Sequence, residues 1–210
     1  MKWVLIQKNP SKQPTKGTYK DWKSLLAQES SNQCAYCAIH ENAMGGIRVF
    51  HVEHYRPKSK FPQHKNDYMN LLYACPICNT FKGDDWPNEP KEDNSAESYP
   101  NPSIIDYNTL FDIDMQSGLI EGKYTSAKYI QEKLFLNRPQ LITERRYKYL
   151  IAKGQEEISL TKSVITQILG NPENEETCRK FMDLWERFDR LVQKLNEIPH
   201  YKMEDVTKKS

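Results

Sequence analysis

The sequence predicts an α+β protein, and three observations lead to this prediction. Two Cys-x-x-Cys pairs lie in the first half of the chain, at Cys34–Cys37 and Cys75–Cys78. Short strand-like segments, among them residues 47–55, occur before residue 125 and are separated by turn signals. From residue 126 onward the apolar period becomes helical. We therefore expect a small β-containing core that is followed by a mostly helical extension.

Length and composition limit the classes of protein that are possible. With 210 residues, the chain can bury one good core, or a small core plus a helical extension. The 30 Lys and Arg residues against 28 Asp and Glu residues give a formal charge of +2, so any binding of nucleic acid must be local. The chain has no long apolar run, and its opening apolar stretch is too short for a signal peptide. We expect a cytoplasmic protein with no membrane segment.

The paired cysteines predict a structural zinc site made by Cys34, Cys37, Cys75 and Cys78. A two-residue gap lets each tight turn direct two thiolates at one point, so two turns supply a tetrahedral site. A redox Cys-x-x-Cys is the alternative, but such motifs usually occur singly. Four thiolates leave no open coordination position, so this zinc would hold residues 34–86 together rather than act in catalysis.

The strand-like segment carries Glu53 and His54 side by side, and Asn79 follows the second cysteine pair directly. We expect Asn79 to open a short helix or the turn before it. Oxygen ligands from Glu53 and Asn79 suit Mg²⁺ or Mn²⁺, and His54 is able to accept a proton near neutral pH. This combination suits attack of water on a phosphodiester. The alternatives are an exposed strand pair for Glu53 and His54, and a plain helix cap for Asn79.

The segments "VEHYRPKS" and "NLLYACPICNTFKGD" resemble the motif of the HNH, or ββα-metal, endonucleases. These segments are most similar to PtuB-like HNH proteins of Septu-type antiphage systems. The motif covers about residues 34–86, and a weaker likeness extends as far as about residue 147. The resemblance implies a zinc-knuckle ββα-metal nuclease core in which His54 is the general base. It also implies that Glu53 and Asn79 hold one Mg²⁺ or Mn²⁺, and that Asn70 braces the loop carrying the base. For Asn70, a turn or cap role explains the residue equally well.

The same resemblance implies partners and a cellular role. Relatives of this kind act as effectors of antiphage defence with a PtuA-like ATPase, and sometimes with a retron reverse transcriptase and its multicopy single-stranded DNA. The substrate would be nucleic acid, either DNA or RNA such as tRNA. The alternative function is a zinc-knuckle nucleic-acid-binding module that does not cut. Competent residues at every motif position favour the nuclease.

Basic residues near the motif are candidates for substrate binding. They are Arg56, Lys58, Lys60 and Lys82. Their position beside the expected site suggests a clamp on the phosphate backbone, although a solvated loop looks the same in sequence. A second basic stretch, residues 2–23, has a weaker claim. His51 shares a strand face with Glu53 and either reaches metal or phosphate, or is a surface or packed residue.

The remaining chain divides into segments by composition and period. Residues 1–33 are expected to pack on the core, and residues 87–125 to form a linker and a hairpin around Gly118. The helical extension, residues 126–200, contains three expected helices, at 126–136, 139–169 and 173–197, and residues 201–210 form a loose tail. The extension carries no catalytic constellation, so it either completes the core or presents a docking face to a partner.

Overall fold

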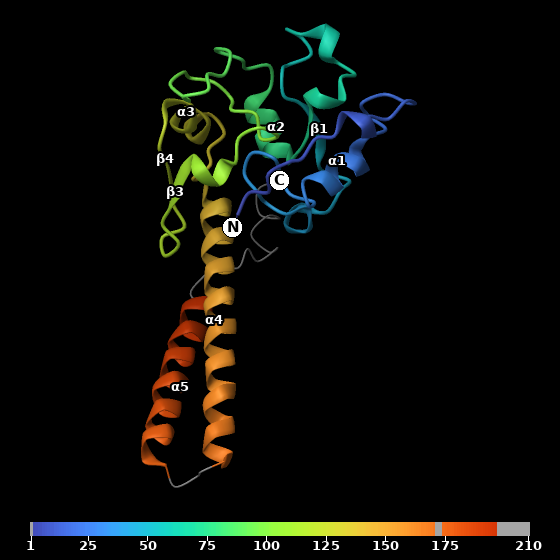
Figure 1. The fold of residues 1–210 in the computed structure, drawn as a ribbon. Helices are drawn as coiled ribbons and strands as arrows, with labels where there is room; N and C mark the ends of the chain where they lie inside the picture. The colour runs from blue at the N-terminus through green and yellow to red at the C-terminus, as the bar shows by residue number, and fades with distance from the viewer. Residues whose placement is uncertain (1, 171–173, 197–210) are drawn as a thin grey trace, which may run out of the picture. The chain divides into compact units, whose positions relative to one another are not determined.

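The computed structural model describes residues 2–170 and 174–196 and divides them into two compact units (Figure 1). The first unit runs to Asp114 and includes Gly118–Ile142, and the second takes Met115–Ser117 and the described residues from Thr143 onward. The predicted α+β class is confirmed, with small sheets in the first unit and long helices in the second. Short 3₁₀-helices cover Pro10–Lys12, Glu41–Met44, Pro62–His64, Tyr68–Asn70 and Tyr107–Thr109.

A two-stranded antiparallel sheet followed directly by a short helix forms the centre of the first unit. Strand β1 (His51–His54) pairs with β2 (Leu71–Ala74), which is buried along its whole length. Helix α2 (Pro76–Lys82) begins at the second cysteine pair, because the Cys75 side chain accepts a hydrogen bond from the Cys78 amide and proline occupies the first helical position. The expectation that Asn79 opens the helix is therefore wrong, and Asn79 lies within it.

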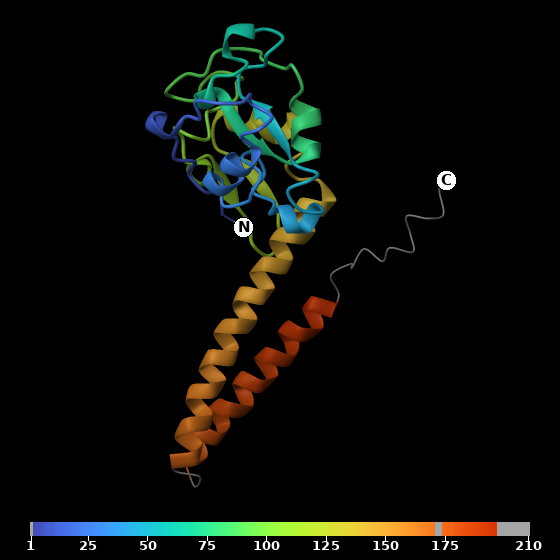
Figure 2. The same ribbon diagram turned by 90° about the vertical axis from the view of Figure 1, so that its right-hand side faces the viewer.

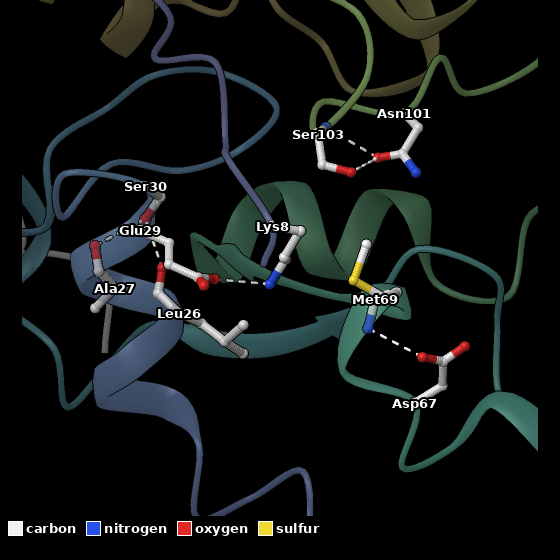
Figure 3. Close-up of polar contacts among 9 residues, drawn as sticks. All are labelled: Lys8, Leu26, Ala27, Glu29, Ser30, Asp67, Met69, Asn101 and Ser103. Atoms are coloured by element: carbon white, nitrogen blue, oxygen red, sulfur yellow. Dashed lines mark hydrogen bonds and ion pairs between the residues drawn. The ribbon is translucent and has the colours of Figure 1, made fainter. Parts of the chain in front are cut away.

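The N-terminal segment is part of the core of this unit. The Trp3 indole donates a hydrogen bond to the Tyr36 carbonyl (2.9 Å) and its ring stacks on Phe111 at 5.3 Å. Lys8 forms an ion pair of 2.9 Å with Glu29, the last residue of helix α1 (Lys23–Glu29) (Figure 3). Through these contacts, Trp3 and Lys8 attach the N-terminal segment to the core that contains the cysteine pairs.

The predicted hairpin around Gly118 is confirmed. Strands β3 (Phe111–Ile113) and β4 (Ile120–Gly122) are antiparallel, and helix α3 (Thr125–Lys133) follows them. Glycine is required at residue 122, because a Cβ atom there would lie 2.5 Å from the backbone nitrogen of Lys128. The hairpin and α3 therefore pack backbone to backbone at this point.

The polar segment 87–103 has no helix or strand, as predicted, but it is attached to the core. Tyr99 is buried, and its carbonyl accepts a hydrogen bond of 2.6 Å from the Tyr55 hydroxyl. The Tyr99 hydroxyl donates to Asp85 (2.8 Å). Through Tyr99, this segment is therefore attached to the residues that follow β1 and α2.

The second unit consists mainly of a helical hairpin, formed by α4 (Pro139–Gly170) from Thr143 onward and by α5 (Glu175–Asn196). The two helices run side by side in opposite directions (Figures 1 and 2), and an ion pair joins Glu157 to Arg187. The helices predicted at 139–169 and 173–197 are confirmed within the described residues, and the predicted tail lies outside them. None of the helices that the structure describes has the length and apolar character needed to cross a membrane.

Candidate metal centres and catalytic pocket

The four paired cysteines converge at one buried point. The Sγ atoms of Cys34, Cys37, Cys75 and Cys78 all lie within 4.8 Å of one another. Sulfurs at the corners of a tetrahedron around zinc, with Zn–S distances of about 2.3 Å, lie about 3.8 Å apart. The Cys37 and Cys75 sulfurs are 3.8 Å apart. The donor set and its spacing therefore fit the predicted structural zinc.

The chemistry of the cluster also suits a cation. Burial raises the pKa of the Cys34 and Cys78 thiols well above the ordinary value; it acts in the same direction on Cys37, but hydrogen bonds from the other three sulfurs outweigh it and lower the Cys37 pKa. Bound together as thiolates, the four sulfurs would need positive charge close by. The Arg138 guanidinium supplies part of it, at 3.5 Å from the Cys37 sulfur and 3.7 Å from the Cys78 sulfur. Arg138 could not be recognised from the sequence, because it is 101 residues away from Cys37 in the chain.

His54 ends strand β1 with one ring nitrogen already engaged. Its Nε2 lies 2.9 Å from the Lys65 carbonyl oxygen and donates to it, so Nδ1 carries the free lone pair. The ring meets Tyr19 edge-on at 4.7 Å. Burial lowers the pKa of His54, the hydrogen bond to Lys65 acts in the opposite direction, and the charge of Lys58 lowers it further. The imidazole is thus neutral, and able to accept a proton, at neutral pH.

Glu53 is buried and ion-paired. The Lys82 ammonium lies 2.7 Å from a Glu53 carboxylate oxygen, and the two side chains are only 0% and 6% exposed. Lys82 also donates a hydrogen bond of 3.0 Å to the His54 carbonyl. Burial raises the pKa of Glu53, and Lys82 opposes this effect. Lys82 therefore fixes the Glu53 carboxylate and the backbone of His54 relative to each other.

One cavity of about 440 Å³ brings the main predicted residues together. Glu53, His54 and Asn79 all line it, as do His51 and Asp84. A carboxylate oxygen and an amide oxygen beside a neutral histidine are a donor set that fits Mg²⁺ or Mn²⁺. Asp84 was not singled out from the sequence, although it stands in the same "NTFKGD" stretch as Asn79.

Asn70 does not line this cavity. It is buried, and its side-chain oxygen accepts a hydrogen bond of 2.7 Å from the Arg56 amide. Its amide nitrogen donates to the carbonyls of Arg56 (3.0 Å) and His64 (3.2 Å). Asn70 thus ties the chain immediately after β1 to the loop that leads into β2, which is the geometry that a bracing role needs.

The predicted basic residues are not gathered in one place. Lys58 lines the cavity, whereas Arg56 is ion-paired with Glu89 at 2.7 Å and Lys60 is exposed outside the lining. The expectation that Lys82 contacts nucleic acid is wrong for this structure, because its ammonium is buried against Glu53. Lys82 follows Cys78 by one helical turn and shares its inward face, which the spacing in sequence already indicates.

The sheet, the helix that follows it and the cysteine cluster define an HNH endonuclease domain, since residues 34–85 match the family model for HNH endonucleases. The chain is also related to the Septu protein PtuB of Bacillus thuringiensis, with 28% identity over 116 residues. That match covers 55% of this chain and 41% of the relative, so the chain spans less than half of the relative's length. No solved structure shows a significant match to the chain.

We expect Lys82→Met to destabilise the first unit strongly. Removing one partner of a buried ion pair leaves the other charge unpaired, and such changes cost about 3–5 kcal/mol. Urea denaturation of zinc-loaded protein in Mg²⁺-free buffer measures the free energy of unfolding. Lys60→Met is the matched control, because Lys60 is exposed and its replacement should change stability by less than about 0.5 kcal/mol. Equal stabilities for the two variants would contradict a structural role for the Lys82 pair.

Proposed function

We propose that this protein is a metal-dependent endonuclease that hydrolyses phosphodiester bonds in nucleic acid and serves in antiphage defence. The observation that supports this most is the state of His54, whose Nε2 is held by the Lys65 carbonyl beside Glu53 and Asn79 in one cavity. A fixed, neutral imidazole next to two oxygen ligands is what activation of water on a phosphodiester requires. The HNH domain match and the relationship to PtuB support the same class.

In the proposed reaction, each residue has a limited task. His54 accepts a proton from water at Nδ1, since Nε2 remains bonded to Lys65. Glu53 and Asn79 would hold the cation, and Lys82 keeps the Glu53 carboxylate oriented. When bound, Mg²⁺ or Mn²⁺ supplies stabilisation of the charge that develops on the phosphate oxygens. Asn70 holds the loop after His54 in place through the Arg56 and His64 backbone.

A cleavage assay tests this function. The full chain, purified without chelators, is incubated with Mg²⁺ or Mn²⁺ and with plasmid DNA, single-stranded DNA or total RNA. We expect cation-dependent cleavage of at least one of these substrates, and much slower cleavage by Glu53→Gln or His54→Ala. Binding of nucleic acid without cleavage, with either cation and with the partner present, would instead support a non-cleaving zinc-knuckle module. An association with a retron reverse transcriptase and its multicopy single-stranded DNA stays a prediction, because none of these observations tests it.

We further propose that the helical hairpin docks on a PtuA-like ATPase. Helix α5 uses a buried stripe, including Leu184 at 7% exposed, for its own hairpin. It also exposes Met182 (57%) and Trp185 (54%), which leaves an apolar face for a partner. With a formal charge of only +2, the isolated chain has little general affinity for nucleic acid, so we expect poor activity alone at physiological salt.

We expect Met182→Glu/Trp185→Glu to abolish co-purification with the co-expressed ATPase while the helical circular dichroism signal is retained. A charge placed on a desolvated apolar contact is costly, whereas on a solvated face it is tolerated. Glu186→Lys, an exposed neighbour, is the control for a change of charge alone, and Leu184→Glu should unfold the hairpin. Retained binding by the folded double variant would remove α5 as the docking helix. Free degradation of nucleic acid by the isolated chain at physiological salt would contradict the proposed restraint.

A further inference from the structure

We propose that the N-terminal segment at residues 19–23 forms one wall of the catalytic cavity and binds the phosphate backbone of nucleic acid through Lys20 and Lys23, together with Lys58. This inference rests on the proposed nuclease function, because it concerns the substrate of the same cavity. Lys20 and Lys23 line the cavity with Glu53, His54 and Asn79, although they lie about thirty residues before β1 in the sequence.

The wall is attached to the residues that carry the proposed chemistry. The Tyr19 ring packs edge-on against the His54 imidazole at 4.7 Å, and the Tyr19 amide donates to the Asn66 side chain (3.2 Å). Lys58 donates a hydrogen bond of 3.5 Å to the Tyr19 hydroxyl, with its ammonium 5.3 Å from the ring centre. Residues 19–23 are thus held against β1 and the loop that follows it, at fixed places around His54.

The charges of this wall are available to a ligand. Within the part of the chain that the structure describes, no carboxylate lies within ion-pair distance of the Lys20, Lys23 or Lys58 ammonium groups. The Lys23 ammonium makes one hydrogen bond, to the Arg48 carbonyl (3.2 Å). Two other cations nearby are already neutralised: Arg56 is paired with Glu89, and Lys82 with Glu53.

The balance of charge within the cavity favours a polyanion. Three lysines face two carboxylates, and one of these carboxylates, Glu53, is matched by Lys82 beneath it. Asp84 is the other. Lysine ammonium groups bind phosphate as point charges without reading base edges, so this wall would position the backbone beside His54 irrespective of sequence. The weak overall charge of the chain makes such a local cluster the main electrostatic contact with substrate.

Equilibrium binding at varied salt tests the proposal separately from cleavage. All variants are made in the His54→Ala background, and fluorescence anisotropy measures Kd for a labelled duplex DNA, a single-stranded DNA and a tRNA between 50 and 200 mM KCl. We expect Lys20→Gln/Lys23→Gln to weaken binding at least 10-fold and to reduce the slope of log K against log salt by about 2, since each lysine lost removes about one phosphate contact. Lys20→Arg/Lys23→Arg should retain both values.

The control variant is Lys123→Gln/Lys128→Gln, which changes the net charge equally at two exposed residues outside the cavity. Zinc content and circular dichroism establish that each variant is folded. Equal losses in the two glutamine variants, an unchanged slope in Lys20→Gln/Lys23→Gln, or no binding of any probe would overturn the inference. Failure of the nuclease function is a separate result: if the wild-type protein binds through these lysines but cuts no substrate, with either cation and with the partner present, the binding proposal is retained and the catalytic proposal is rejected.

Discussion

Replacing His54 with alanine is expected to reduce the rate of cleavage by roughly 10²- to 10⁴-fold, the usual contribution of a general base. The reason is structural, because the Lys65 carbonyl occupies Nε2 and directs the remaining lone pair of the ring to the reaction. Single-turnover rates at saturating Mg²⁺ measure the effect. The fold should survive, since the zinc ligands and the Glu53–Lys82 pair are untouched by the substitution.

His51→Ala provides the comparison for this experiment. His51 lines the same cavity from the same strand but is exposed, so its loss should slow cleavage much less than the loss of His54. Equal losses of cleavage rate in the two variants would contradict the assignment of the general base to His54 alone. Unchanged cleavage by folded, zinc-loaded His54→Ala, under conditions in which the wild type is active, would rule out the proposed base.

Removing zinc is expected to unfold the first unit rather than merely to lower activity. Structural zinc sites contribute roughly 10–16 kcal/mol of apparent binding free energy, which exceeds the whole stability of a typical domain. Metal analysis of protein purified without chelators should give about one zinc per chain. Chelation, or Cys37→Ser, should abolish the near-ultraviolet circular dichroism of the aromatic core and expose residues 34–86 to protease.

Cys178→Ser is the matched control for cysteine loss, because Cys178 lies on α5 and outside the sulfur cluster. It should retain zinc and resist protease as the wild type does. Protein that contains no zinc and is nonetheless folded would refute the structural metal. If chelation lowers cleavage but leaves the aromatic signal unchanged, zinc contributes to activity without holding the fold.

The parts of the fold that were predictable depend on local chemistry. The spacing within each cysteine pair, the turn at Gly118 and the helical periods after residue 126 are all properties of short stretches, and the structure bears them out. The start of α2 was missed for an equally local reason. Cysteine is not among the common capping residues, so the hydrogen bond from the Cys78 amide to the Cys75 sulfur was not anticipated.

The site was predictable in its central residues and not in their surroundings. His54 and Glu53 stand out because two polar side chains interrupt an apolar strand, but the Lys65 carbonyl and the Tyr19 ring reach His54 only through tertiary folding. Lys82 was misinterpreted because lysine is rarely buried unless it is paired, and its partner lies on another element. A lysine in a polar stretch of sequence can therefore be buried when its acidic partner, here Glu53, lies far away in the chain.

The guanidinium of Arg138 has a consequence for where this chain can be divided. Four thiolates around one zinc ion would carry two excess negative charges, and Arg138 offsets one of them from a position far beyond the segment that matches the HNH family. Trp3 belongs to the same core and donates a hydrogen bond to the Tyr36 carbonyl. A fragment cut at residues 34 and 85 would keep every proposed ligand and base, yet lose both of these supports. We therefore expect a piece that folds alone to extend from the first residues past Arg138, well beyond the segment that matches the HNH family.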